Sequence, residues 1–198
     1  MSVTKHKPAT YADLEAVPPN LVAEILFGTL VTHPRPILDH AEATNALGAL
    51  ATGSYQFGNG GPGGWTFPIE PELHLGSHVV VPDIAGWRRE RLQPQRHAAF
   101  TTIAPDWICE TLSPSTEKYD RGQKRAIYAQ FGVGHLWFLD PRVKSLECFV
   151  LQGNEWVLKG TFFDSDKVCA APFDQMTFSL ELLWPPDEPA AANDQSAI

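Results

Sequence analysis

Two acidic residues lie within apolar, strand-like stretches of the chain. Asp83 follows the apolar residues 79–82, and Glu110 lies inside the apolar residues 107–112. A carboxylate is costly to bury unless it is paired or binds a metal. On neighbouring strands the two side chains can face the same side and share one Mg²⁺ or Mn²⁺, because hard cations prefer oxygen ligands. The alternative is that each acid is exposed at a strand end or paired locally.

A lysine on the following segment is the third candidate. Residues 116–131 are predicted to form a helix, on which positions 120, 124, 127 and 131 share one face. Ile127 and Phe131 mark this face as the one packed on a sheet, so Lys124 should lean inward towards Glu110. An inward ammonium could stabilise charge on a phosphate or help to deprotonate an attacking water. Alternatively, its stem covers apolar surface while the ammonium reaches solvent.

Further polar residues have ordinary structural explanations. His40 could act as an acid or base or contact a phosphate, but a histidine on a helix more often makes a structural hydrogen bond. Glu70 and Glu72 could join a metal site, although solvent exposure is the more common outcome. Residues 113–116 lack a Gly-x-Ser-x-Gly pattern, so Ser115 or Thr116 is expected to cap the following helix. No Cys/His cluster has the spacing of a zinc site.

The elements that must position these residues indicate an α/β fold. A strand–helix–strand unit over residues 106–140 implies a parallel pair of strands with a right-handed crossover. Residues 145–151 and 155–163 predict an antiparallel hairpin across Gln152-Gly-Asn. The sequence therefore predicts a mixed sheet flanked by helices.

The N-terminal part supplies further elements. Residues 10–17 predict a short helix that stops at two prolines, and residues 22–33 predict two strands around Phe27-Gly28. Residues 37–51 have apolar positions at helical spacing. Residues 52–64 are rich in glycine and predict a mobile loop.

Length and composition bound the class of protein. The chain has 198 residues, of which 43% are hydrophobic, and this suits one domain over residues 1–184 followed by a proline- and alanine-rich disordered tail over 185–198. No run of about 18 apolar residues exists, and the N-terminus lacks the apolar stretch of a secretion signal. Two of the three cysteines lie in apolar segments, where a small buried thiol is usual. We expect a cytoplasmic protein.

The net charge argues against a simple nucleic-acid binder. Proteins that hold phosphate backbones nonspecifically are usually basic, whereas this chain carries a formal charge of −8. Carboxylates that await a metal account for part of that charge, and further acids lie in the C-terminal tail. The charge therefore bears on the substrate and not on the fold.

Four segments together resemble the bacterial putative restriction endonuclease family of the PD-(D/E)XK nuclease superfamily. They are Val79-Val-Val-Pro-Asp83, Asp106-Trp-Ile-Cys-Glu110-Thr-Leu-Ser-Pro-Ser-Thr116, Asp120-Arg-Gly-Gln-Lys124-Arg-Ala-Ile-Tyr128 and Gly132-Val-Gly-His-Leu-Trp-Phe-Leu-Asp140-Pro141. The similarity extends over about residues 10–184.

The resemblance implies a restriction-endonuclease-like fold and metal-dependent hydrolysis of phosphodiester bonds. It implies Asp83 and Glu110 as ligands of Mg²⁺ or Mn²⁺, and Glu24 as an acidic residue that completes the catalytic site. One departure from the superfamily pattern concerns the lysine that usually lies two residues after the second acid. That position is Leu112, and the resemblance assigns the catalytic lysine to Lys124 on the next helix.

Three functions remain open from the sequence. The first is a metal-dependent endonuclease that acts on DNA, for which a homodimer would be suited because two sites help to cut two strands. The second is a catalytically silent member that keeps the fold as a binding or assembly module. The third is a glycosidase with two carboxylates, which an absence of a sugar-sized aromatic cleft would argue against.

Overall fold

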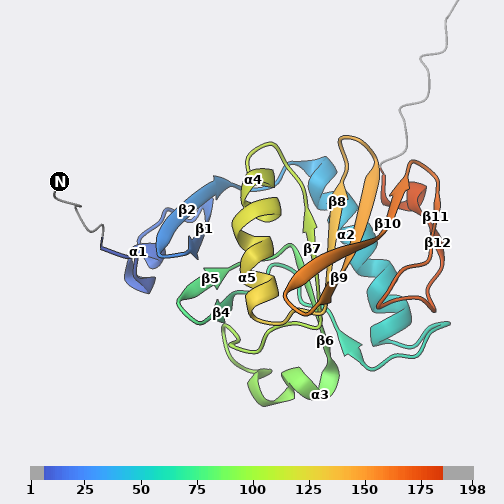
Figure 1. The fold of residues 1–198 in the computed structure, drawn as a ribbon, viewed down its shortest axis with the longest axis horizontal. Helices are drawn as coiled ribbons and strands as arrows, with labels where there is room; N and C mark the ends of the chain where they lie inside the picture. Colours follow the sequence, from blue (N-terminus) through green and yellow to red (C-terminus); the bar gives the residue numbers. More distant parts are fainter. Residues whose placement is uncertain (1–6, 185–198) are drawn as a thin grey trace, which may run out of the picture.

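The computed structural model describes residues 7–184 and contains a six-stranded mixed sheet (Figure 1). Its strands, in spatial order, are β10 (Glu155–Phe163), β9 (Ser145–Gln152), β8 (His135–Asp140), β7 (Trp107–Thr111), β6 (Ile84–Arg88) and β3 (Trp65–Thr66). β7 and β8 are parallel, and the other neighbouring pairs are antiparallel. The predicted strand–helix–strand unit and hairpin are both present, and the predicted α/β class is confirmed.

A second, four-stranded sheet holds the N-terminal strands and is antiparallel throughout. Its spatial order is β2 (Thr29–Pro34), β1 (Leu21–Leu26), β5 (His78–Val80) and β4 (Leu73–Leu75). Single bridges tie loop residues to each sheet: Ile69 bridges to Ile84 of β6 in the large sheet, and Thr101 bridges to Leu73 of β4 in the small sheet. The short link from β5 to β6 joins the two sheets, because β5 belongs to the small sheet and β6 to the large one.

Helical segments connect and cover these sheets. They are α1 (Tyr11–Glu15), α2 (Leu38–Ala51), η1 (Thr52–Gln56), α3 (Arg89–Leu92), η2 (Gln93–Gln95), α4 (Glu117–Tyr119), η3 (Asp120–Lys124), α5 (Arg125–Gln130) and η4 (Leu180–Leu183), and the two-stranded pair β11 (Lys167–Val168) and β12 (Phe178–Ser179) lies near the end of the described chain. α4, η3 and α5 form one continuous helical segment, with a π-helical turn in the middle.

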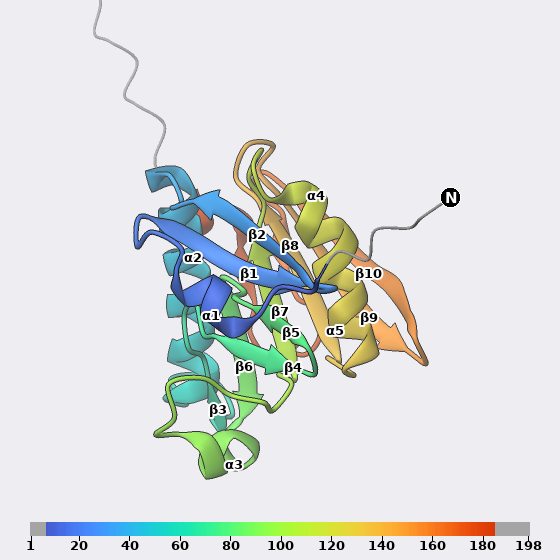
Figure 2. The ribbon, with the colours of Figure 1, turned by 90° about the vertical axis from the view of Figure 1, so that its left-hand side faces the viewer.

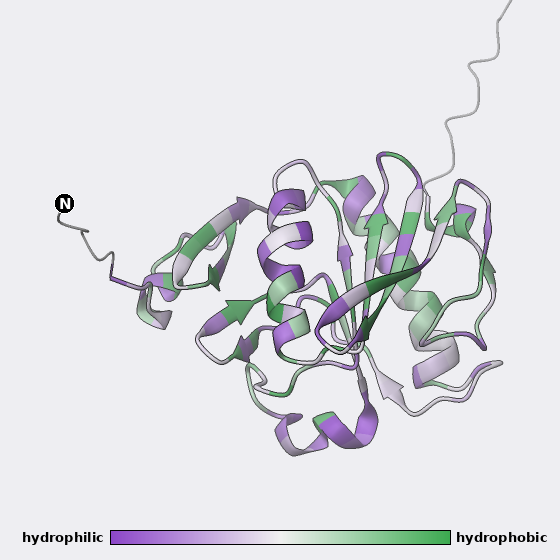
Figure 3. Ribbon diagram, viewed as in Figure 1, coloured by the Kyte–Doolittle hydropathy of each residue, from purple (hydrophilic) through white to green (hydrophobic). Residues whose placement is uncertain are grey.

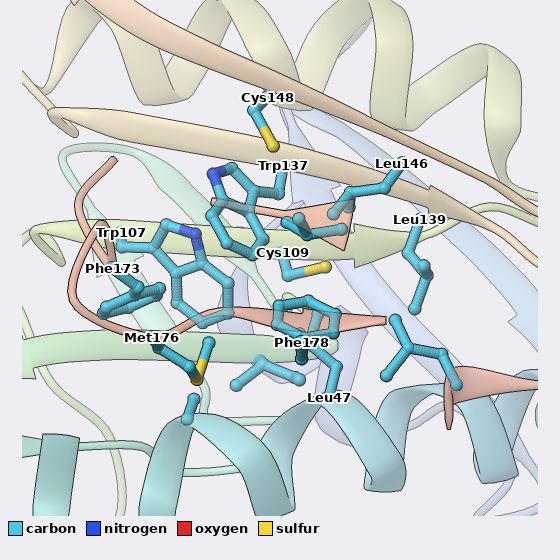
Figure 4. Close-up of a cluster of buried hydrophobic side chains, with 14 of the residues drawn as sticks. Leu47, Trp107, Cys109, Trp137, Leu139, Leu146, Cys148, Phe173, Met176 and Phe178 are labelled. Atoms are coloured by element: carbon cyan, nitrogen blue, oxygen red, sulfur yellow. The ribbon is translucent and has the colours of Figure 1, made fainter. Parts of the chain in front are cut away.

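The helices lie on opposite faces of the large sheet, with α2 on one side and α5 on the other (Figure 2). The α2 side holds a core rich in tryptophan and phenylalanine, in which Trp107, Trp137 and Phe173 pack edge to face (Figure 4). Cys109 and Cys148 are buried in the same core, as the sequence predicts. Aromatic side chains of this size contribute much of the apolar area that stabilises a core.

The second core lies between the other sheet face and α5. Strand β7 contributes to both cores by alternation, because Trp107 and Cys109 face α2 whereas Ile108 faces α5. The central strands are hydrophobic, and the surface helix α3 is hydrophilic (Figure 3). Within residues 7–184, no helix is both long and apolar enough to cross a membrane.

The structure corrects three local predictions. Residues 52–56, expected as part of a loop, extend α2 by the π-helical turn η1. Asp83 lies just before β6 and not inside a strand. Thr116 precedes α4 in the N-cap position, but its side chain makes no capping hydrogen bond. Residues 185–198, expected to form a tail, lie outside the described residues.

Candidate active site

Glu110 enters the site from the centre of the large sheet. In β7 it lies on the same face as Ile108, so its side chain points towards α5, and only 1% of the residue is exposed. Its Oε1 lies 2.9 Å from Lys124 Nζ. The same oxygen accepts a short hydrogen bond from the hydroxyl of Tyr128 on α5. A buried carboxylate in these surroundings is held firmly in place.

Asp83 lies at the junction of the two sheets, in the link from β5 to β6. Its backbone N–H faces Glu110 Oε2 at 3.4 Å, and its Oδ2 accepts a hydrogen bond of 2.7 Å from the N–H of Thr111. The pairing of β6 with β7 places Asp83 beside Glu110, because Ile84 pairs with Cys109. The two predicted acids are therefore neighbours, and the Asp83 side chain keeps 18% exposure.

Lys124 points inward, as the helix periodicity predicts. It is the last residue of the π-helical turn η3, and its side chain is 4% exposed. Besides Glu110, its Nζ lies 3.3 Å from Glu24 Oε1 and 3.2 Å from Asp120 Oδ1. The ammonium also donates to the carbonyl oxygen of Val81 at 3.3 Å. The side chain does not reach past the apolar surface to solvent.

Glu24 comes from the small sheet and completes the group that the sequence singles out. It lies in β1, is 1% exposed, and its Oε1 accepts a 2.8 Å hydrogen bond from the N–H of Val81. Its Oε2 lies 3.6 Å from Nε2 of His33, which is on the neighbouring strand β2. Glu24, Asp83, Glu110 and Lys124 thus converge from two sheets and one helix.

Three further residues of this cluster were not predicted as site residues from the sequence: Asp120, Tyr128 and His33. Asp120, Lys124 and Tyr128 are spaced four residues apart, and this spacing could have predicted that the three side chains share one face of the helical segment. Asp120 and Tyr128 are 2% and 0% exposed. His33 gave no signal in the sequence, because only the pairing of β1 with β2 brings it beside Glu24.

His40 contacts the site from α2. Its Nε2 lies 2.7 Å from the carbonyl oxygen of Thr111 and 3.5 Å from Asp83 Oδ1. A carbonyl oxygen only accepts, so Nε2 carries the hydrogen in this contact. Thr44, one turn later, has its hydroxyl 2.8 Å from that of Thr111. These contacts attach α2 to the end of β7 beside Asp83. His40 therefore makes the structural hydrogen bond that the sequence predicts.

Burial and the neighbouring charges shift the ionisation of the cluster. Burial raises the pKa of Glu110 well above its usual value, and the nearby acids add to this shift although the charge of Lys124 opposes it. Burial alone would lower the pKa of Lys124, but Glu110 and Glu24 outweigh it and hold that pKa well above its usual value. The surrounding acids therefore favour the charged form of Lys124, which suits a role in stabilising negative charge.

A cavity of about 190 Å³ opens onto these groups. Asp83, Glu110, Asp120, Lys124, His33 and His40 all line it. Among the described residues, the lining contains no tryptophan, tyrosine or phenylalanine. This cavity therefore presents no aromatic face on which a sugar ring could stack.

Comparison with known proteins identifies the family. A family model described as "Uma2: Putative restriction endonuclease" matches residues 8–181. The chain belongs to this family. The crystal structure of a putative nuclease belonging to DUF820 from Anabaena variabilis ATCC 29413 has the same fold, with a TM-score of 0.72 at 21% sequence identity, over 89% of this chain and 97% of that one. No match was found among curated proteins.

Membership of the Uma2 family confirms the resemblance seen in the sequence and supports nuclease function. In the wider superfamily a lysine usually lies two residues after the second acid of the site, and this chain has no lysine at that position. Leu112 occupies that position and is 1% exposed in the core beside α5. The structure brings an amine to Glu110 from the helix instead, at Lys124.

Asp83 and Glu110 are two carboxylates of the cavity that could bind a divalent metal. Within residues 7–184, no group of three or more His, Cys, Asp or Glu side chains is arranged to hold a metal ion. Mg²⁺ commonly binds through one or two carboxylates and takes its other ligands from water and substrate phosphate. The adjacent carboxylates of Asp83 and Glu110, both lining the cavity, fit that smaller requirement.

Proposed function

We propose that this Uma2-family chain is a metal-dependent endonuclease that hydrolyses phosphodiester bonds of DNA. The observation that carries the proposal is the convergence of Asp83, Glu110 and Lys124 on one cavity, with Glu110 Oε1 and Lys124 Nζ 2.9 Å apart. Two hard carboxylates and one amine are the groups that metal-assisted phosphodiester hydrolysis requires. Family membership supports the same reaction class.

In this proposal Asp83 and Glu110 hold Mg²⁺ or Mn²⁺. The bound metal would lower the pKa of a water molecule and offset charge on the phosphate. The hydrogen bond from the Thr111 N–H keeps Asp83 beside Glu110. Tyr128 and Lys124 fix the orientation of the Glu110 carboxylate from the other side.

Lys124 contributes a positive charge and not proton abstraction. Its raised pKa keeps it protonated, since Glu110 and Glu24 outweigh the effect of burial. A preorganised ammonium beside the attacked phosphate stabilises the negative charge that builds up in the transition state. Glu24 and Asp120, at 3.3 and 3.2 Å from Nζ, hold the ammonium in place.

The test is cleavage of end-labelled single-stranded and duplex DNA with Mg²⁺ or Mn²⁺. We expect products that disappear in EDTA, and a rate that falls by roughly 100-fold or more in Asp83→Asn and in Glu110→Gln. Glu42→Gln, which changes an exposed acid on α2, is the matched control and should cleave like the unaltered chain. Equal cleavage by all three variants would refute the proposed site.

A catalytically silent module is the second candidate, favoured by one feature of the cluster. The Lys124 ammonium already contacts three carboxylates, so the acids of the site have a cationic partner without any metal. Titration calorimetry with Mn²⁺ separates the two candidates. Binding that is lost in Asp83→Asn supports the nuclease, whereas a folded chain without metal binding and without cleavage supports the silent module.

A further inference from the structure

Two more hollows adjoin the cavity of the candidate active site. One, of about 280 Å³ beside α1, shares Arg35, Glu70 and Val81 with that cavity. The other, of about 110 Å³ beside α2, shares His40, Glu70 and Asp83 with it. Because they share lining residues, the three hollows adjoin one another, and together they are called here the extended groove. The hollows beside α1 and beside α2 make the extended groove longer than the cavity of the candidate active site alone.

The extended groove offers a phosphate backbone very little accessible positive charge. Lys124 and Arg35 are the lysine and arginine residues that line it within the described part of the chain. The side chain of Lys124 is 4% exposed and is surrounded by three carboxylates, whereas that of Arg35 is 56% exposed. Arg35 is therefore by far the more exposed of the two cations in this groove.

Arg35 is paired with an acid that also lines the groove. Its Nη1 lies 3.5 Å from Glu70 Oε2, and its Nη2 donates to the carbonyl oxygen of Pro19 at 3.3 Å. Glu70 is 38% exposed in its side chain, and it lines all three hollows. An ion pair this exposed is weak, so a stronger ligand for the guanidinium can displace it.

The position of Glu70 ties this pair to the catalytic residues. Its backbone N–H donates to the carbonyl oxygen of Asp83 at 3.0 Å, and its φ of +47° is in the left-handed region. A non-glycine residue in this region persists where the surrounding structure holds it. The pair of Arg35 and Glu70 is thus anchored one hydrogen bond away from Asp83.

We propose that Arg35 binds the phosphate backbone of the substrate strand in the extended groove, and that Glu70 competes with the phosphate for Arg35. This inference rests on the proposed function, since it takes the ligand to be a phosphodiester polymer. A guanidinium forms bidentate, charge-assisted hydrogen bonds to phosphate, which are stronger than its single contact with Glu70 at 3.5 Å. Arg35 therefore exchanges the carboxylate for a phosphate as the strand enters.

The experiment measures binding of a fluorescein-labelled DNA strand and its duplex to the full chain by anisotropy, in EDTA and separately in Ca²⁺. We expect Arg35→Ala to weaken binding by roughly 10-fold and to lower the slope of log Kd against log salt by about 0.7–0.9. Arg96→Ala removes an exposed arginine outside the extended groove and is the matched control, expected to bind like the unaltered chain.

Glu70→Gln shows whether the Glu70 carboxylate competes with the phosphate for Arg35 or merely repels the DNA strand. The variant should tighten binding by roughly threefold in the unaltered background and leave it unchanged in the Arg35→Ala background, because the carboxylate acts through Arg35. Equal tightening in both backgrounds would mean that Glu70 merely repels the strand, and would overturn the inference. So would Arg35→Ala behaving like Arg96→Ala, or an absence of DNA binding in both buffers.

Cleavage measured on the same proteins separates this inference from the proposed function. If the unaltered chain binds DNA through Arg35 but does not cleave it with Mg²⁺ or Mn²⁺, the nuclease proposal fails and the inference holds. If the chain cleaves DNA and the Arg35 and Glu70 variants bind and cleave as it does, the inference fails and the nuclease proposal stands.

Discussion

Lys124 determines the electrostatics of the candidate site at the scale of single residues. Burying charged groups is unfavourable because they lose their hydration, and close partners of opposite charge must offset that loss. Here one ammonium contacts Glu24, Glu110 and Asp120 within 3.3 Å. Removing it leaves carboxylates buried without a counter-ion, whereas removing one acid leaves the ammonium two partners.

Lys124→Met keeps most of the apolar stem and removes the charge. We predict that it lowers the free energy of unfolding by about 3–5 kcal/mol, because the buried carboxylates lose their partner. Urea denaturation followed by tryptophan fluorescence measures the change. Lys159→Met, at an exposed position of β10, is the control and should change stability by less than about 0.5 kcal/mol. A loss below about 1 kcal/mol in Lys124→Met would show that the cluster does not depend on the ammonium.

At the scale of elements, the periodicity of apolar residues in the sequence predicts the central strands and the helix that carries Lys124. The apolar runs predict β7 and β8, and the helical spacing predicts that Lys124 faces the sheet. The π-helical turn η3 could not be predicted, since an extra residue in one turn leaves little trace in a pattern of apolar positions. His33 was missed for a similar reason, because strand pairing and not sequence spacing places it beside Glu24.

Gly122 lies within η3 and offers a test at this scale. A Cβ built there meets nothing within 4 Å. Gly122→Ala should therefore raise the free energy of unfolding by about 0.5–1 kcal/mol, because alanine loses less backbone entropy in a helix than glycine does. DNA cleavage should be unchanged.

Gly76→Ala is expected to destabilise the chain and serves as the comparison for Gly122→Ala. Thermal and urea unfolding measure the stability of both variants. Gly76 has a φ of +63°, and a Cβ there would lie 2.9 Å from Phe131 Cζ. We expect a loss of about 1 kcal/mol. If Gly122→Ala destabilised the chain as Gly76→Ala does, the geometry of η3 described here would be wrong.

At the scale of the whole molecule, the large sheet carries two cores, and the end of the described chain closes one of them. Leu180, Leu183 and Trp184 pack into the core on the α2 side. The indole N–H of Trp184 also donates to the carbonyl oxygen of Asp164 at 2.9 Å. These contacts make residues up to 184 part of the folded domain.

Two shortened chains test that boundary. A chain that ends at residue 184 should unfold at the same denaturant midpoint as the full chain. A chain that ends at residue 179 lacks three buried side chains and should lose more than about 4 kcal/mol, at roughly 1.5–3 kcal/mol for each. Thermal and urea unfolding with circular dichroism measures both. Equal losses from the two truncations would place the boundary elsewhere.

The central claim is that Asp83 and Glu110 hold one divalent cation at the cavity that Lys124 lines. Crystals soaked in Mn²⁺ and measured at the manganese absorption edge test it most directly. The account predicts one anomalous peak in contact with both carboxylates, and its loss in crystals of Asp83→Asn. A cavity without a peak at saturating Mn²⁺, or a peak that avoids either acid, would contradict it.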